Sequence, residues 1–179
     1  MTSKELLDSV TDRLAKLDDR TRAAFDSLTD EQANLPVPPS NWSSFQILDH
    51  LLKANGPYLD VLPAAIAQAE ANEAAEARFS WFGKFIAKAA GPLSNAPTPK
   101  PMMPDSGPMI RAKLDEYLAQ NARIRDILNA AKGKDLGTVR MNNPFVKILK
   151  LTLADVFEIF AQHTERHIGQ IEAALPKGP

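Results

Sequence analysis

Residues 161–170 read Ala161-Gln162-His163-Thr164-Glu165-Arg166-His167-Ile168-Gly169-Gln170, and this stretch decides how the rest of the chain is interpreted. Its two histidines stand four positions apart in a run with helical periodicity, so both imidazoles lie on one helix face and can reach a common point. Thr152 with Asp155 can cap this predicted helix, and its inward row consists of Leu153, Val156, Phe160, His163, His167 and Ile171. An imidazole without a polar partner is costly to bury in such a row. The stretch therefore predicts a core-facing helix that carries a polar site.

The third and last histidine of the chain, His50, lies in a second predicted helix. Ser43 and Gln46 have the spacing of a capping box at its start, and Pro57 predicts a kink two turns later. Its inward row consists of Ile47, His50, Leu51, Ala54 and Tyr58. Because every histidine interrupts an apolar row, we expect His50, His163 and His167 to hold one metal ion in the core of a helical bundle. Three buried histidines that only satisfy one another by hydrogen bonding are the alternative.

Two further helices complete the predicted fold. The first covers residues 4–28 and begins with a capping box of Thr2 and Glu5, and Thr29 with Gln32 predicts one more short turn. Another helix is expected to begin at Ser106 and to end before Gly133. No convincing strand pair is present. The chain is therefore predicted to be an all-α four-helix bundle that forms a single domain over residues 1–179.

The region between the second and third bundle helices is the least regular part of the sequence. Residues 64–77 are rich in alanine and have strong helix propensity, and residues 81–90 predict a short helix. The Pro-rich segment 91–108 follows as a long insertion for which no secondary structure is predicted. Such a long irregular segment is uncommon inside a domain and is often functional.

The charge balance and the absence of cysteine argue against several classes of function for this chain. The chain has 21 basic and 22 acidic residues, a net charge of -1, so we expect no nucleic-acid partner. It has no cysteine, which excludes disulfides, thiolate ligands and a cysteine nucleophile. Neither a secretory signal nor an apolar run long enough for a membrane span is evident, so a cytoplasmic location and no membrane association are expected.

Two short motifs resemble the DinB-like/YfiT-like family of four-helix-bundle, metal-dependent proteins. They are Asn41-Trp42-Ser43 followed by Ile47-Leu48-Asp49-His50-Leu51-Leu52, and His163-Thr164-Glu165-Arg166-His167-Ile168-Gly169-Gln170-Ile171. The resemblance implies a divalent metal, zinc or nickel, held by His50, His163 and His167. Some members of the family, transferases and an isomerase, use the metal to activate a low-molecular-weight thiol, and others are described as hydrolases. The resemblance therefore implies one of these reactions. Homodimers are common in the family, so a homodimer is also expected.

Several other residues are candidates for the surroundings of the metal. Tyr58 follows His50 by two turns on the same helix face, and Gln170 lies one turn beyond His167, so both are expected near a pocket. Trp81 could cover the site as a lid, although such aromatic residues more often pack against a bundle end. Trp42 is expected to pack as a staple at the helix entrance. Asp49 and Glu165 adjoin ligands in sequence, which turns them about 100° away, and we expect them at the surface.

Two classes of function follow. The first is a metal-dependent enzyme that activates a thiol or water against a small electrophilic substrate, as a thiol transferase or a hydrolase. The second is a non-catalytic module that binds a metal or ligand, because no acid–base residue stands out beside the histidines and the catalytic residues are unknown. The sequence does not identify the metal, since imidazole suits zinc, nickel, iron and copper.

Overall fold

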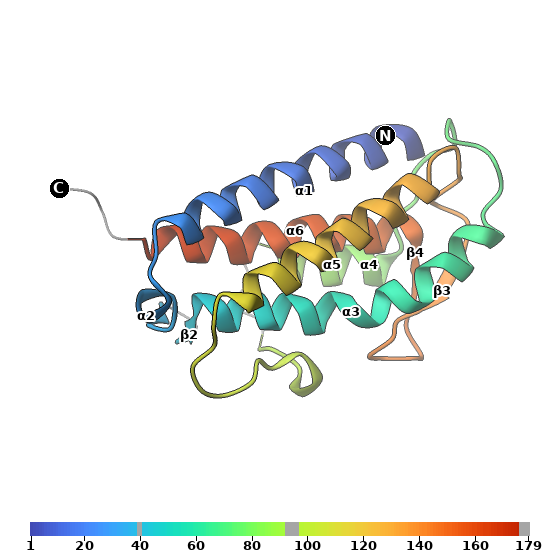
Figure 1. Ribbon diagram of the computed structural model, residues 1–179. Coiled ribbons are helices and arrows are strands. Elements are labelled where there is room, and N and C mark those ends of the chain that lie inside the picture. The colour runs from blue at the N-terminus through green and yellow to red at the C-terminus, as the bar shows by residue number, and fades with distance from the viewer. Residues whose placement is uncertain (39–40, 92–96, 176–179) are drawn as a thin grey trace.

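Four long helices lie side by side in the computed structural model, which describes residues 1–38, 41–91 and 97–175 (Figure 1). They are α1 (Ser3–Asp26), α3 (Ser44–Gln68), α5 (Ala112–Ala130) and α6 (Leu153–Ala173). Three short helical elements connect them, namely α2 (Asp30–Ala33), α4 (Trp81–Ala90) and the 3-10 helix η1 (Lys100–Met102). The predicted all-α four-helix bundle is therefore confirmed. None of the described helices is long and apolar enough to cross a membrane.

The packing order of the helices determines where a site can form. α1 packs against α6 and α5, and α3 packs against both α5 and α6. The chain between α3 and α5 returns to the bundle in two places, because α4 packs against α6 and η1 packs against α3. The groove between α3 and α6 is therefore covered by α4 and by the described part of the Pro-rich segment, residues 97–108.

Capping boxes begin the helices as the sequence predicts. Thr2 with Glu5, Thr29 with Gln32, Ser43 with Gln46 and Thr152 with Asp155 each exchange both side-chain-to-backbone hydrogen bonds of the motif. Each pair satisfies two amide groups that have no partner within the helix. α3 then continues without a break through Pro57 and Pro63.

The expectation that the chain has no strand pair is wrong. β1 (Pro36–Val37) pairs with β2 (Trp42–Ser43), and β3 (Arg140–Asn142) pairs with β4 (Lys150–Thr152), both antiparallel. These strands are too short to show the alternating pattern by which a strand is recognised. β2 and β4 directly precede α3 and α6, so the two small sheets fix the entry points of the helices that carry the histidines.

α5 begins later than the sequence indicates. We expected Ser106 to cap it, but its first residue is Ala112. The reason is Arg111, whose amide and guanidinium groups donate to the carboxylate of Asp30 and whose guanidinium also donates to the carbonyl of Leu28. These contacts with the end of α1 and the start of α2 hold the preceding segment outside the helix.

Helix propensity also gives a wrong prediction for the residues that follow α3. The alanine-rich stretch 64–77 suggested a continuing helix, but α3 ends at Gln68. The amide of Ser3 donates to the carbonyl of Ala75 at 2.8 Å, so the beginning of the chain takes up hydrogen-bonding groups that a helix would use internally. Tertiary contacts therefore override local propensity in this stretch.

The predicted short helix over residues 81–90 is confirmed as α4. Its N-cap Ser80 accepts a hydrogen bond from the amide of Gly83, and its own amide donates to the Asp155 carboxylate at 2.9 Å. A Cβ atom at Gly83 would overlap the Asp155 carboxylate. The close attachment of α4 to the start of α6 therefore requires a glycine at this position.

Candidate metal centre

The three histidines meet in the groove between α3 and α6. Nε2 of His163 lies 3.1 Å from Nε2 of His50 and 3.1 Å from Nε2 of His167. One ligand atom from each residue lies within 4.8 Å of the other two. His50 comes from α3 and the other two from α6, so the packing of two helices far apart in sequence brings the imidazoles together.

Hydrogen bonds fix the tautomers of two of these histidines. Nδ1 of His50 lies 2.7 Å from the backbone carbonyl of Met102, and Nδ1 of His167 lies 2.8 Å from Oε1 of Gln170. Both partners are oxygen acceptors, so each Nδ1 carries the hydrogen and each neutral ring presents a lone pair at Nε2. Two lone pairs therefore point at Nε2 of His163, which can supply only one hydrogen in return.

This donor set fits a divalent cation. Tetrahedral ligation by imidazole at ~2.0–2.1 Å separates ligand nitrogens by about 3.3–3.4 Å. The observed 3.1 Å separations are close to that value. Hydrogen bonds to the second ring nitrogen, as His50 and His167 make here, are typical of metal-ligating histidines.

The surroundings keep the imidazoles neutral, which is the form that binds metals. Burial lowers the pKa of His50 and lowers that of His163 well below its ordinary value. Burial, with smaller contributions from the charges of His50 and Arg166, lowers the pKa of His167 to about 3. At neutral pH the three rings therefore carry no charge to repel a cation.

The histidines form part of the wall of a cavity of about 580 Å³. This volume lies within the range of small-molecule sites. The lining residues come from α3, α4, α6, Trp42 and the Pro-rich segment; they are Trp42, His50, Ala54, Asn55, Tyr58, Ile86, Ala89, Ala90, Pro97, Thr98, Pro99, Met102, Met103, Ile159, His163, Arg166, His167 and Gln170. No residue of α1 or α5 is among these described lining residues. The described walls of the cavity are therefore formed by α3, α4, α6, Trp42 and the Pro-rich segment, and they include Tyr58 and Ile159 of the hydrophobic core.

The candidate pocket residues differ in position. Tyr58 and Gln170 line the cavity, but Trp81 is not among the described lining residues. Its side chain is 72% exposed and contacts the rings of Phe82 and Phe85 on α4. Trp42 also lines the cavity, with its ring centroid 5.0 Å from that of His50.

Two polar residues of α3, Asn55 and Tyr58, are among the residues that line the cavity. Asn55 is only 2% exposed, and its Nδ2 has no hydrogen-bond partner in the described part of the chain. The hydroxyl of Tyr58 accepts a hydrogen bond from Nδ2 of Asn143 at 2.9 Å, which leaves its own hydrogen free to donate. Burial raises the pKa of Tyr58, so this hydroxyl stays protonated.

Sequence reasoning missed Arg166. It lines the cavity, and among the described residues its Nη1 donates a hydrogen bond to the carbonyl of Ala89 at 3.3 Å. No carboxylate among the described residues forms an ion pair with it, and although burial lowers its pKa, a guanidinium stays charged at neutral pH. Its position three residues after His163, on the same face of the helix, is the signal that could have found it.

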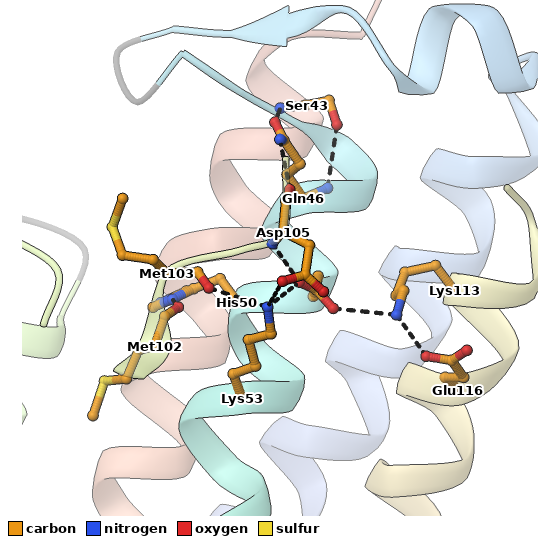
Figure 2. Close-up of polar contacts among 10 residues, drawn as sticks. Ser43, Gln46, His50, Lys53, Met102, Met103, Asp105, Lys113 and Glu116 are labelled. Carbon is orange, nitrogen blue, oxygen red and sulfur yellow. Dashed lines mark hydrogen bonds and ion pairs between the residues drawn. The ribbon is translucent and has the colours of Figure 1, made fainter. Parts of the chain in front are cut away.

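The segment 102–105 is fastened to α3 next to His50 (Figure 2). The amide of Asp105 donates to the carboxylate of Asp49 at 2.9 Å, and Nζ of Lys53 lies 2.9 Å from Asp49 and 2.6 Å from the Asp105 carboxylate. Nζ of Lys113 on α5 lies 3.1 Å from Asp49. Burial opposes ionisation of Asp49, but these donors together lower its pKa.

The expectation that Asp49 lies at the surface is therefore wrong, since it is only 3% exposed. Its partners Asp105 and Lys113 are far away in sequence, and they cover the side of α3 that adjoins His50. Glu165 is partly exposed, with 45% of its side chain accessible, and faces Arg13 of α1.

Comparisons with known proteins agree with this fold. The profile of the DinB superfamily matches residues 13–171. The solved structure of YfiT from Bacillus subtilis, described as "a probable metal-dependent hydrolase with an unusual four-helix bundle topology", matches with a TM-score of 0.62 and 17% sequence identity. The match covers 97% of this chain and 88% of that chain. A search of curated proteins found no match.

Proposed function

This chain belongs to the DinB superfamily, and from that premise we propose that it is a metal-dependent enzyme acting on a small electrophilic substrate. His50, His163 and His167 are the proposed ligands, and zinc or nickel is the proposed metal. The observation that carries the proposal is the convergence of three Nε2 atoms at the wall of a cavity large enough for a small molecule. The description of YfiT as a metal-dependent hydrolase supports it.

Each part of the site has a role in this proposal. His50, His163 and His167 would hold a divalent cation, which would supply Lewis-acid chemistry to a water or thiol. Met102 and Gln170 hold the rings of His50 and His167 with their lone pairs directed inward. Ile86, Ile159 and the other apolar lining residues exclude water from the substrate.

The proposed nucleophile is water, in a hydrolase reaction, or a low-molecular-weight thiol, in a transferase reaction. The description of the similar protein YfiT supports the hydrolase reaction most directly. The cavity of about 580 Å³ also has room for a thiol beside a small substrate.

One observation favours a second function, a non-catalytic module that binds a metal or ligand. No aspartate or glutamate is among the described residues that line the cavity. The side chains most often used for proton transfer, other than the histidines themselves, are therefore absent from that lining.

Metal content tests the ligand assignment. Protein without a histidine tag, reconstituted with zinc or nickel, should hold about one equivalent per chain, and His163→Ala should lose it because an open imidazole site needs all three ligands. Glu165→Ala, on the same helix but facing Arg13, is the matched control and should retain the metal. Less than about a tenth of an equivalent in the wild type would contradict the assignment.

Activity separates the two functions. Metal-loaded protein is tested with activated esters for hydrolysis and with several thiols and electrophiles for thiol transfer. Rates that depend on His50 in either assay support the enzyme and identify the nucleophile. Equal rates for the wild type and His50→Ala, in protein shown to bind metal, would favour the binding module.

A further inference from the structure

The cavity carries positive charge that no carboxylate in its described lining balances. Arg166 contributes one charge, and a divalent cation on His50, His163 and His167 would add two more. A partly buried charge in a mainly apolar setting is unfavourable unless an opposite charge or hydrogen-bond acceptor is supplied. Among the described residues, the hydrogen-bond acceptor for Arg166 is the carbonyl of Ala89, at 3.3 Å.

The acidic residues of the same helix are engaged elsewhere. Glu158 and Glu165 pair with Arg13 of α1 at 2.9 and 3.3 Å. Glu172 pairs with Arg20 of α1 at 2.5 Å. These three carboxylates therefore neutralise the α1 side of α6 and are not available to Arg166.

The wall formed by α3 does not supply the missing negative charge. Apart from His50, its polar lining residues are Asn55 and Tyr58, and neither is a carboxylate. The Tyr58 hydroxyl accepts a hydrogen bond from Nδ2 of Asn143 at 2.9 Å. Among the described lining residues, none carries a negative charge opposite Arg166, which leaves that role to a ligand.

We propose that the substrate of this cavity carries a carboxylate on an apolar body, with Arg166 binding the carboxylate. The proposal rests on the proposed function, because it describes the substrate of that site. A single planar guanidinium suits a carboxylate, which it can bind through two parallel hydrogen bonds. The apolar body matches Ile86, Met102 and Ile159 in the lining.

Calorimetric titration with phenylacetate and with its uncharged analogue phenylacetamide tests the proposal. The full chain is first freed of metal with a chelator, so that no ion can bind the carboxylate. Wild-type protein should bind phenylacetate at least about tenfold more tightly than phenylacetamide, since charge-assisted hydrogen bonds exceed neutral ones by this amount or more. Arg166→Gln should remove that preference, and Arg166→Lys should keep part of it.

A matched control and a second variant distinguish a specific role of Arg166 from a general effect of charge or folding. Arg123→Gln makes the same charge change at an exposed position of α5 and should leave the preference intact. Arg166→Lys retains the positive charge and so examines the same contact even if Arg166→Gln fails to fold. Arg166→Gln should also bind zinc as tightly as the wild type or more tightly, because a neighbouring positive charge is removed.

The outcomes separate this proposal from the proposed function. Equal affinity for the two probes, or no measurable binding of either, would overturn the carboxylate site even if one equivalent of zinc is bound. A preference for phenylacetate that depends on Arg166, in a protein that binds no metal, would support the carboxylate site and contradict the metal-dependent enzyme.

Discussion

The two sides of α6 differ in whether their charged side chains have partners of opposite charge. Toward α1, the carboxylates of Glu158, Glu165 and Glu172 are paired with Arg13 and Arg20. Toward α3 and α4, the same helix presents His163, His167 and Arg166 to a cavity whose described lining has no carboxylate. One helix thus supplies a neutralised packing face and a face with unbalanced positive charge.

The difference separates residues that pair with one another within the fold from residues that are proposed to bind a ligand. Partly exposed ion pairs such as those with Arg13 and Arg20 add little stability each, and no ligand is needed to complete them. On the other face of α6, the histidine lone pairs and the half-buried guanidinium of Arg166 are unfavourable without a ligand. Changes to the cavity face should therefore alter metal binding, and changes to the α1 face should alter stability alone.

The largest effect should follow metal removal. At free zinc of 1000 times its dissociation constant, bound metal should stabilise the folded protein by about 4 kcal/mol, and chelation should remove this increment. Thermal unfolding with zinc and with a chelator measures it, and His50→Ala should unfold at the same temperature in both. An unchanged melting temperature in the wild type would instead indicate three histidines that satisfy only one another.

The attachment of α4 to the cavity side of α6 should be the next most sensitive point. Gly83→Ala should destabilise the protein by about 2–3 kcal/mol, because the new methyl group overlaps the buried Asp155 carboxylate. Urea unfolding measures this free energy. Gly169→Ala on α6 is the matched control, since no atom lies near its Cβ position, and it should stabilise the protein by about 0.5–1 kcal/mol. Equal effects of the two substitutions would contradict the close contact.

Gln170 should act through His167 and not through the fold. Gln170→Ala should weaken zinc affinity about tenfold, because Nδ1 of His167 loses the acceptor that orients the ring. Competition with a chelator of known affinity measures this change, and Gln170→Glu should restore binding because a carboxylate also accepts from Nδ1. Unchanged zinc affinity in Gln170→Ala would exclude this positioning role.

On the α1 face, Arg13→Ala should destabilise the protein by about 1 kcal/mol, since two partly exposed ion pairs are lost. The loss should shrink in high salt, as screening weakens the pairs in the wild type. Urea unfolding at low and high salt measures it, and zinc affinity should stay at the wild-type value. A variant that loses zinc affinity would show that the two faces are not independent.

The smallest expected effect is a pH dependence at Glu172. A hydrogen bond from Arg20 lowers the pKa of Glu172 below its ordinary value of 4.5. The resulting stabilisation is therefore complete above the unfolded-state pKa and disappears as pH falls through the folded-state pKa. It should amount to a few tenths of a kcal/mol, because both side chains are partly exposed. Urea unfolding of Glu172→Gln and wild type at neutral and acidic pH measures it; an equal difference at both pH values would contradict this assignment.

Features that depend on neighbouring residues were predictable from the sequence. The capping boxes at Thr2, Thr29, Ser43 and Thr152 join residues three apart, so their spacing is visible in the chain itself. The inward direction of His50, His163 and His167 also follows from helical periodicity. The four bundle helices and their order are confirmed on the same basis.

Features that depend on distant contacts were not predictable. The burial of Asp49 requires the amide of Asp105, and the late start of α5 requires the contacts of Arg111 with Asp30. Periodicity also does not reveal that α4 packs against α6 and η1 against α3, so that both contribute residues to the cavity that the histidines line. The homodimer, the cytoplasmic location and the single domain over residues 1–179 stay predictions.

The wide separation of the histidines in sequence has a consequence for protein synthesis. His50 precedes His163 by 113 residues, and chains emerge from the ribosome beginning at the N-terminus. Until α6 has been made, the growing chain offers a metal ion a single histidine from this set. The strongest-binding metals, such as copper, would bind almost any available group of nitrogen ligands. Because the three histidines come together only when the last helix packs against the bundle, the geometry of the folded protein would determine which metal ion binds.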